Sequence, residues 1–129
     1  MNTIEVLTKA RDLISNKDNW CVDVLQRRSQ GGPTQHCVMG AINMAANGTA
    51  CHAFRPGYSH EAVKVLDKVC IRLFGDDPDV RGYIGNKSIV VNNKLGHDAI
   101  ILALDTAIGD YPDHAPKEET CERRLAARV

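Results

Sequence analysis

The chain has 129 residues, of which 43% are hydrophobic and 25% charged, a composition typical of one soluble globular domain with a buried core. Its 16 basic and 16 acidic side chains cancel, which excludes the basic excess of a dedicated nucleic-acid binder and the acidity of a nucleic-acid mimic. No apolar run approaches the roughly 20 residues that cross a bilayer, and residues 1–5 do not resemble a secretory signal. The 5 cysteines, which show no repeated spacing, are then expected to be reduced thiols in a cytoplasmic protein.

The first predicted element is an amphipathic helix that begins after Asn2 and ends before Asn16. Asn2 and Glu5 fit an N-cap and its third position, and apolar residues recur at helical spacing as far as Ile14. The Asn and Asp residues of segment 16–19 compete for backbone hydrogen bonds and end the helix. Residues 20–25 partly alternate and predict a short extended segment, and residues 26–33 form a polar loop rich in glycine.

Three further helices are predicted from periodicity and capping residues. The second covers about residues 34–46 and stops at Asn47 and Gly48. The third is capped by Ser59 and closed by Gly75, and the last covers residues 97–108 with strict helical spacing. Between them, residues 77–79 predict a turn or a single helical turn, and residues 87–91 predict a short β-like run.

These elements predict a mainly α protein, folded as a compact single-domain bundle of about four helices. At most one small β-hairpin is expected, pairing residues 20–25 with residues 87–91. The domain is expected to cover residues 1–109, and residues 110–129 form a charged C-terminal tail that could adopt a loose helix.

Several of these segments together resemble a known pattern. They comprise Asn19 and Trp20, residues 37–42 (Cys-Val-Met-Gly-Ala-Ile), Asn92 and Asn93, and the helix end Leu104, Asp105, Ala107 and Ile108. Their order resembles a small uncharacterised family of bacteria and their phages, with a Cys-Ala-hydrophobic-Gly-Ala helix and a Trp-Asn-Asp turn before a hydrophobic-Leu-Asp-x-Ala-Ile helix. The resemblance covers residues 4–109 and departs from the pattern at Val91, where the family has tryptophan, and at Asn93, where it has aspartate. It implies an architecture and no known activity.

Cys37 is the candidate reactive residue, because it follows the Gly31-Gly32-Pro33 loop and opens an apolar helix. The positive end of a helix favours thiolate and lowers a cysteine pKa. A lone cysteine in an apolar helix is nevertheless most often a small core residue. The enzymatic alternative is a cysteine hydrolase. In it Cys37 is the nucleophile, His97 the base, Asn92 or Asn93 the group that orients the base, and Gln35 an oxyanion donor.

A zinc site is the other chemical alternative. His36, Cys37, Cys51 and His52 form two mirrored pairs that could supply four ligands. Adjacent residues point in different directions in helices and strands, so this spacing does not favour a metal site. The glycine loop also lacks the ending of a phosphate-binding loop, and no cofactor is expected.

The leading functional prediction is a non-catalytic cytoplasmic protein that acts through protein–protein contacts, as a phage or mobile-element accessory factor or a host-interaction factor. A protein partner is expected, rather than nucleic acid or a membrane, and the oligomeric state is left open. The binding surface is expected at the loop ends, where two helix N-termini would face one cleft. Its predicted residues are His36, Cys37, His52, Arg55, Tyr58, Asn92, Asn93 and His97. In the alternative interpretation these loops are only the solvent-exposed ends of the bundle and have no binding role.

Overall fold

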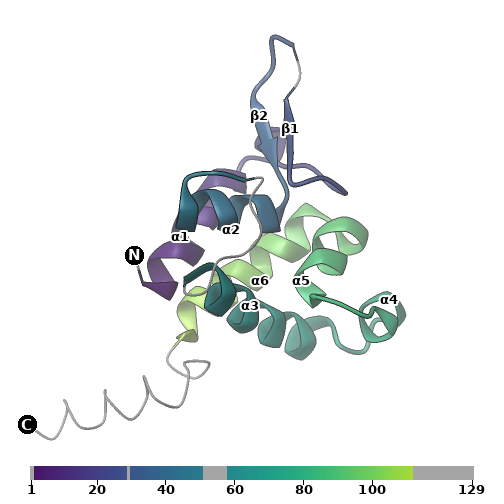
Figure 1. Cartoon of the computed structure of the whole chain (residues 1–129). Coiled ribbons are helices and arrows are strands. Elements are labelled where there is room, and N and C mark those ends of the chain that lie inside the picture. The colour runs from purple at the N-terminus through teal and green to yellow at the C-terminus, as the bar shows by residue number, and fades with distance from the viewer. Residues whose placement is uncertain (1, 29, 51–57, 112–129) are drawn as a thin grey trace, which may run out of the picture.

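The computed structural model describes residues 2–28, 30–50 and 58–111, which are mainly helical with one small hairpin (Figure 1). The four longest helices are α1 (Thr3–Ile14), α2 (Val38–Asn47), α3 (Tyr58–Phe74) and α6 (His97–Gly109). The shorter elements are the 3₁₀ turn η1 (Lys17–Asn19), the strands β1 (Gln26–Arg28) and β2 (Thr34–His36), the helices α4 (Pro78–Gly82) and α5 (Lys87–Val90), and the π-helical turn η2 (Val91–Leu95). The predicted class is confirmed, and the two short helices add to the four that were expected.

Helix α1 begins and ends where its capping residues predict. The side-chain oxygen of Asn2 accepts the backbone N–H of Glu5 at 2.9 Å, which satisfies one of the unpaired donors at the helix start. On the outer edge of the helix, Arg11 pairs with Asp105 of α6 at 2.9 Å. This pair connects the first helix of the chain to the last.

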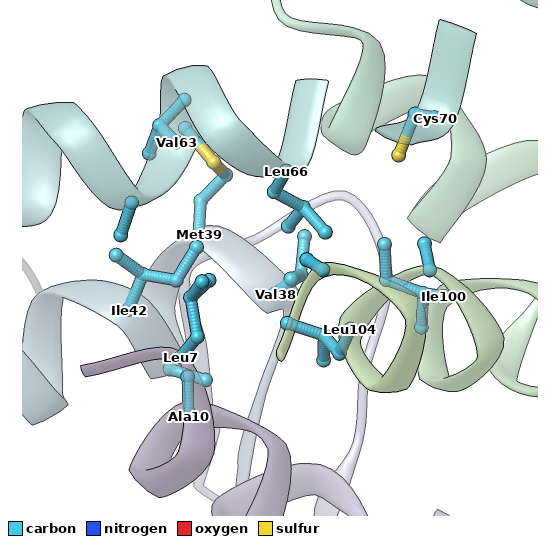
Figure 2. Packing of buried hydrophobic residues seen from close by; sticks show 14 of the residues in the cluster. Leu7, Ala10, Val38, Met39, Ile42, Val63, Leu66, Cys70, Ile100 and Leu104 are labelled. Atoms are coloured by element: carbon cyan, nitrogen blue, oxygen red, sulfur yellow. The ribbon is translucent and has the colours of Figure 1, made fainter. Parts of the chain in front are cut away.

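The hydrophobic core lies between the four long helices, with α2 nearly enclosed by the others. Helices α1 and α3 pack against α2, and α6 packs against both α1 and α3. Figure 2 shows this packing through Leu7 and Ala10 of α1, Val38, Met39 and Ile42 of α2, Val63, Leu66 and Cys70 of α3, and Ile100 and Leu104 of α6. Each fully buried Leu or Ile side chain stabilises the fold by about 1.5–3 kcal/mol. No described helix is both long and apolar enough to cross a membrane.

Helix α2 ends as predicted but begins later. Gly48 closes it with φ +77, a left-handed conformation that glycine adopts at little steric cost. The predicted start at residue 34 is wrong, because residues 34–36 form strand β2 and Cys37 has extended backbone as the N-cap. Pairing with β1 gives these backbone groups the hydrogen bonds that a first helical turn would have left open.

The hairpin joins segments other than those predicted. Strand β1 pairs antiparallel with β2, with Arg27 opposite Gln35, whereas residues 20–25 and 87–91 do not pair. A short loop closes this pairing locally, with Gly31 at φ +76, and closing a short loop loses less chain entropy than joining distant segments. In Figure 1 the hairpin projects away from the helices. Trp20 forms an isolated parallel bridge with His36, the last residue of β2.

The predicted β-like run at residues 87–91 is also wrong, because α5 and the start of η2 cover it. Ser88, Val90 and Val91 are all buried there, so this apolar run reflects burial on several sides of a helix rather than one face of a strand. Lys87 holds α5 in place by donating hydrogen bonds to two backbone carbonyls, of Val80 at 2.7 Å and Tyr83 at 2.6 Å.

Candidate functional site

Asn92 lies at the centre of a buried polar junction where several chain segments meet. Its side chain is 1% exposed, and its Oδ1 accepts hydrogen bonds from the indole N–H of Trp20 at 2.7 Å and the backbone N–H of Val38 at 3.0 Å. Its Nδ2 donates to the carbonyl of Cys21 at 3.2 Å and to Oδ1 of Asn93 at 2.9 Å. These four bonds use the full hydrogen-bonding capacity of the amide. Asn92 therefore acts as a connector between segments.

The π-helical turn η2 places both asparagines at this junction. Such turns are rare and are often found at functional sites. Gly96, at φ +102, follows η2 and allows the chain to turn into α6. Oδ1 of Asn93 also accepts the backbone N–H of Asp23 at 3.1 Å, and Asp23 has the uncommon φ of +68. These contacts tie residues 21–25 to η2.

Cys37 is the N-cap of α2, and burial controls its chemistry. Its Sγ accepts the backbone N–H of Gly40 at 3.5 Å, and the residue is 8% exposed. Burial raises the pKa of the Cys37 thiol, while its hydrogen bonds with backbone N–H groups act in the opposite direction. The expectation of a lowered pKa at the helix N-terminus is therefore reversed, because removing the thiolate from water outweighs the helix end.

His97 makes its polar contact with the backbone of α1. A carbonyl oxygen only accepts, so the ring Nε2–H of His97 donates to the carbonyl of Ile14, at 2.7 Å. The ring also meets the indole of Trp20 edge-on, with ring centroids 5.3 Å apart. Cys37 and His97 thus lie around the same connecting pair, Trp20 and Asn92. Their described polar contacts nevertheless go to different groups.

His36 is buried beside the same junction and is 5% exposed. Its backbone carbonyl accepts the N–H of Cys21 at 3.1 Å, whereas its ring Nε2 has no hydrogen-bond partner among the described residues. Burial lowers the pKa of His36, and the positive charge of Arg28 lowers it further. The ring is therefore neutral near pH 7.

Residues 21–25 cover the start of α2. A Cβ placed on Gly40 would lie 1.9 Å from the carbonyl oxygen of Leu25, so only glycine permits this approach. The thiol of Cys21 donates to the carbonyl of Val24 at 3.5 Å in the same segment. The close neighbour of Gly40 is therefore this loop.

The other predicted site residues do not join the junction through described contacts. The amide of Gln35 donates to the carbonyl of Asp18 in η1 at 3.1 Å. Cys51, His52 and Arg55 lie outside the described residues, and Tyr58 begins α3 without a described side chain. Among the described residues, no three His, Cys, Asp or Glu side chains are grouped to hold a metal. Two of the four residues of the zinc alternative cannot be placed.

The hairpin forms a second feature, which sequence reasoning missed. We call residues 24–36 the arm. Arg27 and Arg28 are exposed on β1, and Val24 and Leu25 at its base are 42% and 38% exposed. The available signal was the Gly31-Gly32-Pro33 turn between two polar runs, which is compatible with a hairpin as well as with a loop.

Residues 1–110 match the model of a family of unknown function, DUF6197, and the chain belongs to this family. The matched range contains every described element from α1 to α6. No curated protein and no solved structure matches the chain significantly. The geometry of the junction and the arm is therefore the basis for any statement about function.

Proposed function

We propose that the protein is a non-catalytic cytoplasmic factor that binds another protein through the arm. The observation that carries this proposal is the exposure of the arm, which projects from the helices (Figure 1) and has mostly exposed residues in its described part. The arm leads directly into the junction, because β2 ends at His36 and Cys37 follows. A partner on the arm therefore lies next to the loop ends that the sequence predicts as the binding surface.

The chemistry of the arm favours an acidic surface on the partner. Arg27 and Arg28 are exposed on neighbouring positions of β1, and residues 24–60 contain no Asp or Glu. Arginine is enriched at protein interfaces, and its planar guanidinium binds carboxylates through two parallel hydrogen bonds. The exposed Val24 and Leu25 add an apolar contact beside these charges. Positive charge next to an exposed apolar surface is suited to the recognition of an acidic protein.

The junction supports a structural role better than the cysteine hydrolase alternative. Nucleophilic catalysis needs an accessible thiol with a base in hydrogen-bond reach. The Cys37 thiol is buried with a raised pKa, and Nε2 of His97 donates to the carbonyl of Ile14. Asn92 uses its amide to join backbone and indole groups. These contacts favour a structural role for the junction, as the buried base that holds the arm.

We also propose a bacterial or phage setting for the protein. The resemblance in residues 37–42, 92–93 and 104–108 favours a bacterial or phage origin, and with it a role as an accessory or host-interaction factor. Membership of a family of unknown function is compatible with such a role. The partner is then a protein of the host or of the infecting phage.

The test compares the proteins that three forms of the full chain capture from infected and uninfected bacterial host cells. These are the wild type, the arm variant Arg27→Glu/Arg28→Glu, and the control Lys64→Glu/Lys68→Glu, which makes the same charge change at exposed positions of α3. The expected partner binds the wild type and the control, and its affinity falls at least ~10-fold with the arm variant, equivalent to about 1.4 kcal/mol.

That partner must also bind as a purified protein with the same ranking of variants. Equal binding by all three forms, or equal loss in both variants, would overturn the assignment to the arm. Capture of nucleic acid in place of protein, dependent on Arg27 and Arg28, would overturn the class of partner.

A further inference from the structure

Cys21 and Cys37 each follow one member of a parallel β-bridge at the base of the arm. Trp20 and His36 form a parallel β-bridge, and the carbonyl of His36 accepts the N–H of Cys21 at 3.1 Å. Neighbouring strands lie about 4.8 Å apart, and a continuation of this isolated bridge by one residue sets Cys21 opposite Cys37 with both side chains on the same side. This spacing lies within the range of about 4.4–6.8 Å between Cα atoms that a disulfide needs. The bridge and the hydrogen bond from Cys21 to His36 therefore favour a register in which the two cysteines can be joined.

The two thiols also lie beneath the same piece of chain. Cys21 Sγ donates to the carbonyl of Val24, and Cys37 Sγ accepts the N–H of Gly40. The carbonyl oxygen of Leu25 lies so close to Gly40 that a Cβ there would be 1.9 Å from it. Residues 24–25 thus contact the Cys21 sulfur and the glycine whose N–H binds the Cys37 sulfur. The pKa of Cys21 is raised mainly by burial, and the nearby Cys37 raises it further.

We propose that Cys21 and Cys37 form a dithiol site that hydrogen peroxide converts to an intramolecular disulfide at the base of the arm. One thiol loses its proton and attacks a peroxide oxygen, so that the O–O bond breaks and a sulfenic acid forms with release of water. The second sulfur then attacks the sulfenic sulfur, the S–S bond forms, the S–O bond breaks and a second water leaves. In total, two thiols are oxidised and one peroxide is reduced to two waters.

The bond encloses the whole arm in a covalent loop. It restricts the arm in the unfolded chain, which favours the folded state, and it withdraws Cys37 Sγ from the N–H of Gly40. Oxidation therefore changes both the arm and the start of α2. This inference is independent of the proposed function, because the disulfide can be formed and measured without any partner.

The test uses the two arginines that lie between the cysteines in the sequence. The full chain is oxidised with hydrogen peroxide at about pH 8.5, where more thiolate is present, until the number of free thiols stops changing. Trypsin is then added briefly to cut after Arg27 or Arg28, which are exposed, and after the protease is stopped the remaining thiols are blocked with iodoacetamide in urea. The fragments on the two sides of the cut are expected to migrate together on a non-reducing gel and to separate after reduction.

Variants identify the cysteines involved. Cys21→Ser and Cys37→Ser are expected to give separated fragments without reduction, and serine at position 37 retains a good N-cap, so this variant should fold. The matched control is Cys70→Ser on α3, since the fully buried Cys70, whose pKa burial raises to about 12, is not expected to take part. Cys51→Ser and Cys121→Ser should also keep the fragments joined.

Two results would overturn the proposal. The first is a final state in which Cys21 and Cys37 both remain reduced in the folded wild type, so that its fragments separate. The second is a cross-link that survives in the Cys37→Ser variant, because another cysteine would then be the partner of Cys21. Far-UV circular dichroism on each variant shows that the comparison is made between folded proteins.

Discussion

Replacement of Asn92 by alanine tests whether this amide holds the junction together. The change leaves the N–H of Val38, the indole N–H of Trp20 and the carbonyl of Cys21 without their described partner. A buried polar group without a hydrogen bond costs about 1–3 kcal/mol. With the half-buried indole at the low end of that range, the loss of unfolding free energy should be roughly 3–7 kcal/mol. A loss of this size is a large part of the ~5–15 kcal/mol of a typical domain.

The assay is urea unfolding, followed by far-UV circular dichroism and by the fluorescence of Trp20, the only tryptophan of the chain. With a denaturant slope of about 1–3 kcal/mol per molar, the midpoint should fall by roughly 2 M urea. Asn93→Ala is the matched control. It removes, at a less buried position, one acceptor that serves the N–H of Asp23 and one N–H of Asn92, and it should lose only about 1–2 kcal/mol. A loss below about 1 kcal/mol for Asn92→Ala, or equal losses for the two variants, would refute the reasoning.

Three further predictions follow from individual contacts. Gly40→Ala should lower the unfolding free energy by ~2 kcal/mol or more, because its Cβ collides with the Leu25 carbonyl, whereas Gly82→Ala, with open space around it, should be neutral or stabilising in the same urea assay. Burial raises the pKa of Asp67, so the folded state holds this proton to higher pH than the unfolded state, and its contribution to stability falls as the pH rises from 3.8 through the raised value. The stability of the wild type relative to Asp67→Asn, measured from about pH 3 to pH 7, should therefore decrease with pH, and an increase would contradict the assignment. Iodoacetamide should modify Cys37 at least ~10-fold more slowly in the folded protein than in urea, as followed by peptide mass spectrometry, while a faster reaction in the folded protein would favour the hydrolase.

Sequence reasoning identified several members of the junction but not their roles. The helix starts and the asparagine turn in the sequence point to Cys37, Asn92, Asn93 and His97. In the structure, all four belong to the junction around Trp20 and Asn92. The helix N-terminus, which lowers the pKa of Cys37, is visible in the sequence, whereas the burial that raises it is not. The π-helical turn of Asn92 has no comparable sequence signal.

Elements with local causes could be predicted from the amino-acid sequence. The cap at Asn2, the left-handed Gly48 and the periodic apolar residues of α1 and α6 depend on neighbours within one or two turns, and these elements lie where they were predicted. The conformations of residues 34–36 and 87–91 depend on contacts with distant parts of the chain. A strand requires a partner and a short apolar run fits either a strand or a buried helix, so pairing with β1 and burial against the core made the choice. The same holds for Asn92, whose four hydrogen-bond partners come together only when the chain has folded.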